Sequence, residues 1–291
     1  MRALAVAWQR VPGQTVAGRG VVRVRDYAQS MAESAAVEWD AASDAGEAAA
    51  FEGERRWWGR HVQELRWQAE LARLLVDPVF RGEGVVRGDG GPVLLIPGFL
   101  AGDASLLVMA DWLRRMGHRA YGSGIRLNVD CSNRALLGLE RRLELVAEGA
   151  ARPVVLVGHS RGGHFAKALA HRRPELVSRV VSIGAGLDAP FAISQPTLAA
   201  VAVARVIHAR TTDRRSRHGC FTAGCGCEFA HHYRAAFPER IPLTSIFSKG
   251  DGVVRWQACV VPYAHCVEVT GSHVGLAVNR KSYRALADAL A

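Results

Sequence analysis

From residue 92 onward, short apolar runs alternate with segments of helical spacing. The runs are rich in Val, Leu and Ile and are apolar at successive positions, as in parallel strands covered on both faces. The segments between them suit helical crossovers. We therefore expect an α/β fold with a mostly parallel sheet flanked by helices. The predicted strands are Pro92–Ile96, Arg119–Gly122, Pro153–Val157, Arg179–Ile183, Leu243–Ser248 and His265–Val269.

The first 89 residues have a different pattern, with Ala-, Glu- and Arg-rich stretches of helical spacing. Between Glu54 and Val76, apolar residues recur at steps of three and four, which predicts a helix with one apolar stripe. Asp77-Pro78 should end that helix. We expect a helical N-terminal extension over 1–89 and a second unit over 90–291. The extension either packs on that unit or turns tryptophans towards an interface or lipid; these are Trp57, Trp58 and Trp67.

One motif follows the strand Pro153–Val157 and opens a helical segment. It reads Gly158-His159-Ser160-Arg161-Gly162-Gly163, the G-x-S-x-G pattern in its strand-to-helix context. A serine on such a tight turn projects its hydroxyl above the sheet, and Gly158 and Gly162 leave room for the neighbouring backbone. The alternative is a glycine-rich turn in which Ser160 merely caps a helix. The preceding apolar strand argues against it.

Two further residues lie where partners of a nucleophilic serine are needed. Asp251 follows the strand Leu243–Ser248, and His273 follows the strand His265–Val269. Each alone is an ordinary turn or helix-start residue. Together they give the chain order Ser, Asp, His, with all three at the carboxyl ends of strands, where sites in parallel sheets lie.

An oxyanion site needs backbone N–H groups close to the serine. The strand Pro92–Ile96 leads into Pro97-Gly98-Phe99-Leu100. We expect the N–H of Phe99 to pair with the N–H of Arg161, with Leu100 as the alternative first donor. Gly98 would support this turn.

These motifs together resemble the α/β-hydrolase superfamily, and more narrowly its bacterial lipase and esterase branch. The resemblance covers about residues 90–291. It implies a Ser160–His273–Asp251 triad that cleaves carboxylic esters through an acyl-enzyme, with no metal or other cofactor. It departs from the branch at Pro97, where many lipases have His before the Gly, and residues 1–89 match nothing. An acyltransferase with the same triad and a non-catalytic ligand-binding protein on this fold remain alternatives.

A long insertion separates the fourth and fifth predicted strands. It spans about 185–241, more than a bare crossover needs, and its apolar stretch from Pro196 to Ala209 suits a lid over Ser160. A helix simply buried against the sheet is the alternative. A second helix is expected over Cys227–Phe237.

The insertion also holds a group of cysteines and histidines, which suggests a zinc site. The cysteines lack the paired C-x2-C spacing of structural zinc sites, so we expect no metal. The sequence leaves two disulfides open under oxidising conditions. One would lie within this loop or join it to Cys131, and the other would join Cys259 to Cys266. The group comprises His218, Cys220, Cys225, Cys227, His231 and His232.

Charge and hydropathy limit the partners. The net charge is +10, but all but three of the 37 Lys and Arg residues are arginines, and no block of like charge occurs. We therefore expect no nucleic-acid partner. The resemblance implies a small acyl ester or lipid substrate, and the positive charge at most favours peripheral contact with an anionic lipid interface. No apolar stretch is long enough for a membrane span. The N-terminus is a poor signal peptide, which makes the cytoplasm the expected location and leaves export by another route as the alternative. The sequence leaves the oligomeric state, acyl chain length and disulfide pairing open.

Overall fold

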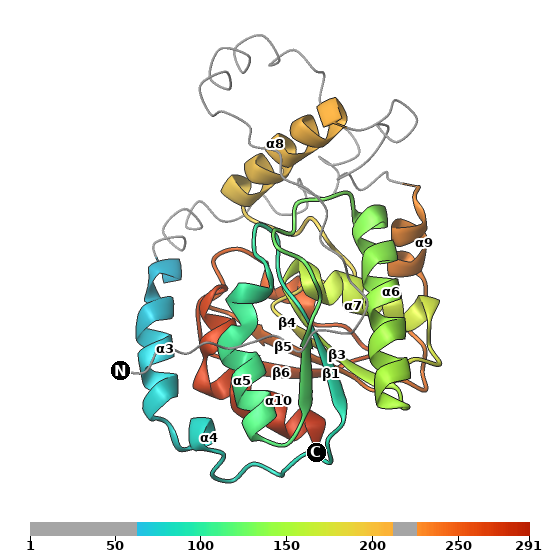
Figure 1. Ribbon diagram of the computed structural model, residues 1–291. Coiled ribbons are helices and arrows are strands. Elements are labelled where there is room, and N and C mark those ends of the chain that lie inside the picture. The colour runs from blue at the N-terminus through green and yellow to red at the C-terminus, as the bar shows by residue number, and fades with distance from the viewer. Residues whose placement is uncertain (1–62, 212–225) are drawn as a thin grey trace.

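A computed structural model describes residues 63–211 and 226–291 (Figure 1). In these residues six strands form one parallel sheet in the order β2-β1-β3-β4-β5-β6. The strands are β1 (Pro92–Ile96), β2 (Arg119–Gly122), β3 (Val154–His159), β4 (Val177–Ile183), β5 (Leu243–Ser248) and β6 (His265–Val269). All six predicted strands are confirmed, and β3 runs two residues further than expected, directly up to Ser160.

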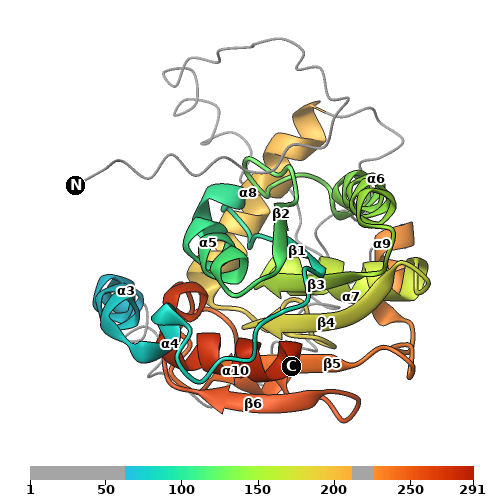
Figure 2. The same cartoon turned by 60° about the horizontal axis from the view of Figure 1, so that its bottom comes forward.

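Helices cover both faces of this sheet (Figure 2). The α-helices are α3 (Trp67–Val76), α4 (Pro78–Arg81), α5 (Leu107–Arg115), α6 (Ser132–Ala150), α7 (Arg161–Arg172), α8 (Gln195–Thr211), α9 (Glu228–Arg234) and α10 (Arg280–Leu290). Short 3-10 turns are η3 (Asp103–Leu106), η5 (Trp256–Cys259) and η6 (Gly275–Val278).

Alternate residues of β1 enter two separate cores. Leu95 packs in one cluster with Trp112 of α5 and Tyr283 of α10. Leu94 points the other way and joins a cluster that contains Phe165 of α7. All five side chains are fully buried, and burying one large apolar side chain stabilises the fold by about 1.5–3 kcal/mol. This is why the strands are apolar at successive positions.

The segment before the sheet packs on the first of these cores. Leu74 of α3 is fully buried in it. The helix ends at Val76 as predicted, and Asp77 then caps the short helix α4 by accepting from the Val79 amide. The same carboxylate binds Arg280 and Arg284 of α10 at 3.2 and 2.9 Å. The part of the predicted helix that carries Trp57 and Trp58 lies outside the described residues.

The strand order creates an opening at one edge of the sheet. β1 lies between β2 and β3, so the chain leaves β1 in one direction and β3 in the other. At such a switch point the loops after the two central strands diverge at their carboxyl ends, and a crevice forms there. The segments that follow β1 and β3 are those that carry Phe99 and Ser160.

The described residues of the insertion between β4 and β5 include the helices α8 and α9, as predicted. Val203 and Val206 of α8 are 41% and 40% exposed, so this helix is not buried against the sheet, and it stands above the carboxyl edge in Figure 1. Within the described residues, no helix combines the length and the apolar character needed to cross a membrane.

The described cysteines are all thiols. The sequence leaves open a disulfide between Cys259 and Cys266, and the structure does not form one. Cys259 is buried, and Cys266 Sγ lies 3.5 Å from two backbone carbonyls, those of Val261 and Ala264. In the described parts of the chain no group of His, Cys, Asp and Glu is arranged to hold a metal ion. His218, Cys220 and Cys225 lie outside those parts.

Candidate active site

Ser160 occupies a sharp turn between β3 and α7. Its backbone angles, φ 53° and ψ −126°, are rare for a residue with a side chain. The turn is held by the Ser160 amide, which donates to the Ile183 carbonyl at 2.8 Å. A Cβ on Gly158 would overlap the backbone of Gly162, and one on Gly162 would overlap the Ile96 carbonyl. The two glycines of the motif are therefore required by close backbone packing.

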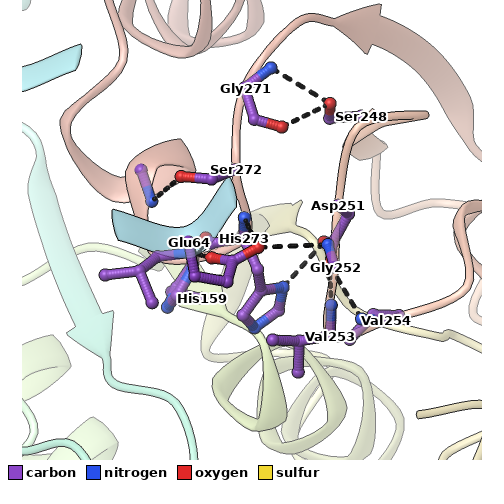
Figure 3. Close-up of polar contacts among 12 residues, drawn as sticks. Glu64, His159, Ser248, Asp251, Gly252, Val253, Val254, Gly271, Ser272 and His273 are labelled. Carbon is purple, nitrogen blue, oxygen red and sulfur yellow. Dashed lines mark hydrogen bonds and ion pairs between the residues drawn. The ribbon is translucent and has the colours of Figure 1, made fainter. Parts of the chain in front are cut away.

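Asp251 and His273 form a buried pair (Figure 3). Nδ1 of His273 lies 2.7 Å from Oδ2 of Asp251. The other carboxylate oxygen accepts the amides of Val253 and Val254 at 2.8 and 2.7 Å. Only one oxygen is thus directed at the imidazole, which keeps a proton on Nδ1 and leaves Nε2 as the base.

The pKa of His273 is raised above its ordinary value of 6.5. Burial opposes the charged imidazolium and by itself lowers the pKa, but the charge and hydrogen bond of Asp251 outweigh burial, and the carboxylate of Glu64 adds to them. The site therefore stabilises a proton on His273.

His159 connects the serine turn to the histidine loop. Its Nε2 lies 2.9 Å from the His273 carbonyl, and the two rings are 5.0 Å apart between centroids. A carbonyl can only accept, so Nε2 of His159 carries the proton. Burial, with a smaller contribution from His273, lowers the pKa of His159 to about 4, and the ring is neutral at physiological pH.

Gly184 brings Ser160 close to the Asp251–His273 pair. It follows Ile183, the residue that accepts the Ser160 amide. A Cβ on Gly184 would lie 3.4 Å from both Asp251 Oδ2 and His273 Nδ1. The structure thus gathers the three residues that the sequence singled out at one end of β3, β4 and β5.

Asn128 is almost fully buried and binds the loop after β1 by two hydrogen bonds. Its side-chain amide donates to the Pro97 carbonyl at 2.8 Å, and its own carbonyl accepts the Leu100 amide at 3.2 Å. The Leu100 N–H is therefore already used, which leaves Phe99 as the candidate oxyanion donor in this loop. Leu100 also has φ 59°, so the turn after Phe99 is tight.

The side chain of Arg161 is held by neighbouring polar groups of the fold rather than exposed to solvent. Its guanidinium donates to Oδ1 of Asn128 at 2.9 Å, to the Asp130 carbonyl at 2.7 Å and to Oγ of Ser132 at 3.0 Å. Burial lowers the pKa of Arg161 to about 10, so it remains charged at neutral pH. Its backbone is thereby fixed at the first position of α7, where the helix N-terminus presents N–H groups.

A cavity of about 180 Å³ adjoins Ser160. Its walls come from five places: the Phe99 loop, the start of α6, the start of α7, the loop after Asp251 and the insertion, which contributes most of them. The lining is mainly apolar, with aromatic side chains from α9. Apolar members of the wall include Phe99, Phe191, Ile193, Val201, Phe229, Tyr233, Val253 and Val254.

Sequence reasoning missed Asn128 and His159 as contributors to this site. His159 is part of the motif itself, but its bond to a residue 114 positions away has no local signature. Asn128 lies in the connection after β2, and no pattern in that segment marks it. Only the folded arrangement gives either residue its role.

No protein-family model matches this sequence, and no curated protein sequence does. Several solved structures, however, are similar to this chain. The mature form of the lipase BlEst2 from Bacillus licheniformis superposes with a TM-score of 0.50 over 70% of this chain and 94% of that one, at 15% identity. The chain has the α/β-hydrolase fold.

Two further lipases have similar coverage. A monoglyceride lipase from Saccharomyces cerevisiae matches 68% of this chain and 84% of its own, at 14% identity and a TM-score of 0.48. A monoacylglycerol lipase from Paleococcus ferrophilus matches 69% and 95%, at 15% identity and a TM-score of 0.48. The BlEst2 match and the parallel sheet agree with the α/β-hydrolase fold expected from the motifs, and Ser160 follows the third strand along the chain.

Proposed function

We propose that the protein is a serine hydrolase that cleaves carboxylic esters. The observation that carries the proposal is the buried Asp251–His273 hydrogen bond, 2.7 Å long, beside a serine on a strained turn. A carboxylate, an imidazole and a nucleophile turn that borders a cavity are the parts that acyl transfer needs. The apolar cavity next to Ser160 suits the acyl chain of an ester.

In the proposed mechanism, Ser160 Oγ attacks the ester carbonyl while His273 Nε2 takes its proton. Asp251 holds the tautomer and stabilises the imidazolium. The N–H groups of Phe99 and Arg161 bind the oxyanion, and loss of one such donor costs about 3–4 kcal/mol of transition-state stabilisation. His273 then protonates the leaving alcohol, and water releases the acyl group from Ser160 by the same steps in reverse.

The test is a series of p-nitrophenyl esters from short to long acyl chains, measured with the wild type, Ser160→Ala and Asp251→Asn. We expect Ser160→Ala to be inactive and Asp251→Asn to lose about 10⁴-fold in kcat, because the imidazole adopts the wrong tautomer. A fluorophosphonate probe should label Ser160 in the wild type only. Ester hydrolysis that survives in Ser160→Ala would refute the proposal.

The same experiment separates the two alternatives. Added alcohol acceptors divert the acyl group to new esters if the protein is an acyltransferase, whereas a hydrolase releases mainly free acid. A ligand-binding protein without activity would neither turn over esters nor react with the probe. The Asp251 contact of His273 and its raised pKa support a catalytic protein over a ligand-binding one.

A further inference from the structure

Two carboxylates from the segment before the sheet reach the loops that carry Asp251 and His273. Glu64 lies in the turn at residues 63–66, and Glu70 lies in α3. Neither residue belongs to the motifs that the sequence singled out. Both sit some 200 positions away along the chain from the backbone amides they bind.

Glu64 joins the two loops through a single carboxylate (Figure 3). Its Oε1 accepts the Gly252 amide at 3.1 Å and the His273 amide at 2.9 Å. Its Oε2 accepts the amide of Val274 at 2.9 Å. One acid therefore binds the residue after Asp251 and the backbone of His273 itself.

Glu70 binds the His273 loop at Ser272, one residue before His273. It accepts the Ser272 amide at 2.9 Å and the Ser272 hydroxyl at 3.3 Å. A Cβ on Gly275 would overlap its carboxylate, so the glycine makes room for it. Burial raises the pKa of Glu70, although the two hydrogen bonds from Ser272 oppose that shift. The acid is thus enclosed in the fold.

The segment before β1 does not need the Glu64 and Glu70 contacts in order to pack on the core. Leu74 already anchors α3 in the core, and Asp77 already ties the segment to α10. The loops at Gly250–Gly252 and Gly271–Ser272 are short and rich in glycine. The Ser248 hydroxyl joins them at Gly250 and Gly271, and Glu64 adds a second link at the residue next to Asp251 and at His273 itself. Hydrogen bonds from amides to a carboxylate are among the stronger ones available. Glu64 also raises the pKa of His273.

We propose that Glu64 is a positioning residue that fixes the Asp251 loop against the His273 loop and so aligns the pair for catalysis. The proposal rests on the proposed function for the role of the pair, but the geometric claim does not require ester turnover. The segment before β1 is then part of the active-site architecture, because it supplies a contact that spans both loops at the catalytic pair.

The test compares Glu64→Ala and Glu64→Gln with Glu83→Gln. Glu83 is an exposed acid nearby in the chain that pairs only with Arg81 among the described contacts, and it serves as the matched control. We expect kcat of Glu64→Ala to fall about 100-fold with KM nearly unchanged, because a displacement of about 1 Å has that effect on catalysis. Glu64→Gln keeps one acceptor oxygen but turns an NH2 group towards another amide, so its kcat should be intermediate.

A second readout is independent of activity. The Nδ1 proton shared by His273 and Asp251 should give a far-downfield proton NMR signal that Asp251→Asn removes. We expect that signal to broaden or disappear in Glu64→Ala and to persist in Glu83→Gln, with both variants folded by circular dichroism. If Glu64→Ala cannot be purified folded, Glu64→Gln carries the same comparison.

The outcomes separate the two proposals. An unchanged signal and unchanged kcat in the folded Glu64 variants would overturn the positioning role while leaving ester hydrolysis intact. A lost signal in a protein that turns over no ester would support the positioning role and refute the proposed function. A fall in thermal stability with an unchanged signal would reduce Glu64 to a structural contact and would also overturn the proposal.

Discussion

The Nε2 of His159 donates a hydrogen bond to the main-chain carbonyl of His273. The residue next to the candidate nucleophile thus holds the backbone of the candidate base. Because burial keeps His159 neutral, the ring has one N–H, and it is used in this contact. Two of the loops that must stay aligned for acyl transfer are joined by this bond.

Replacing His159 should therefore affect both stability and turnover. His159→Leu leaves a buried carbonyl without this donor, which should cost about 1–3 kcal/mol of folding free energy, and kcat should fall. His159→Gln retains an amide donor at a similar reach and should recover part of both losses. Urea unfolding and steady-state kinetics measure the two effects. His265→Leu, at an exposed position of β6, is the control, and equal stability of His159→Leu and the wild type would contradict the expectation.

The pH dependence of activity should reflect the raised pKa of His273. Only the neutral imidazole accepts the serine proton, so kcat/KM should fall on acidification with a midpoint above 6.5. By linkage, the same shift contributes folding stability below pH 6.5 that disappears as pH rises through the folded-state pKa. A kcat/KM profile from about pH 5 to pH 9 tests the first statement; a midpoint below 6.5 would contradict it.

Gly184 and Gly90 together separate the effect of backbone strain from the effect of crowding in the site. It has φ 61°, and a Cβ there would press on Leu276 at 3.0 Å as well as on the Asp251–His273 pair. Gly90 has φ 81° with nothing within 4 Å of the same position. Both Gly184→Ala and Gly90→Ala should lose about 1–2 kcal/mol of stability from the left-handed backbone. Only Gly184→Ala should lose kcat as well; thermal melts and initial rates decide this.

Val201 of α8 lines the cavity beside Ser160, whereas Val206 of the same helix is exposed and outside its wall. Val201→Phe adds a ring to a space of about 180 Å³ and should lower kcat/KM for long acyl chains while sparing acetate esters. Val206→Phe should leave the chain-length profile unchanged. A parallel series of esters measures both, and identical profiles would show that the acyl chain does not bind along α8.

The strands could be predicted because most of them are local apolar runs, and Ser160, Asp251 and His273 could be named as candidates because each lies within a few residues of the end of a predicted strand. The parallel order then brings these positions to one edge. Contacts that depend on distant residues have no such signature. Glu64 is separated from His273 by 209 positions and Asn128 from Pro97 by 31, and both are ordinary polar residues in their own segments.

The backbone of Ser160 has a consequence for how this protein responds to selection. Residues held in sparsely populated φ/ψ regions cost about 1–3 kcal/mol, and glycine would relieve that strain at φ 53°. Ser160→Gly should therefore melt at a higher temperature than the wild type while losing the candidate nucleophile. Stability and activity are in conflict at this one position, so a screen for thermal resistance alone would favour an inert protein.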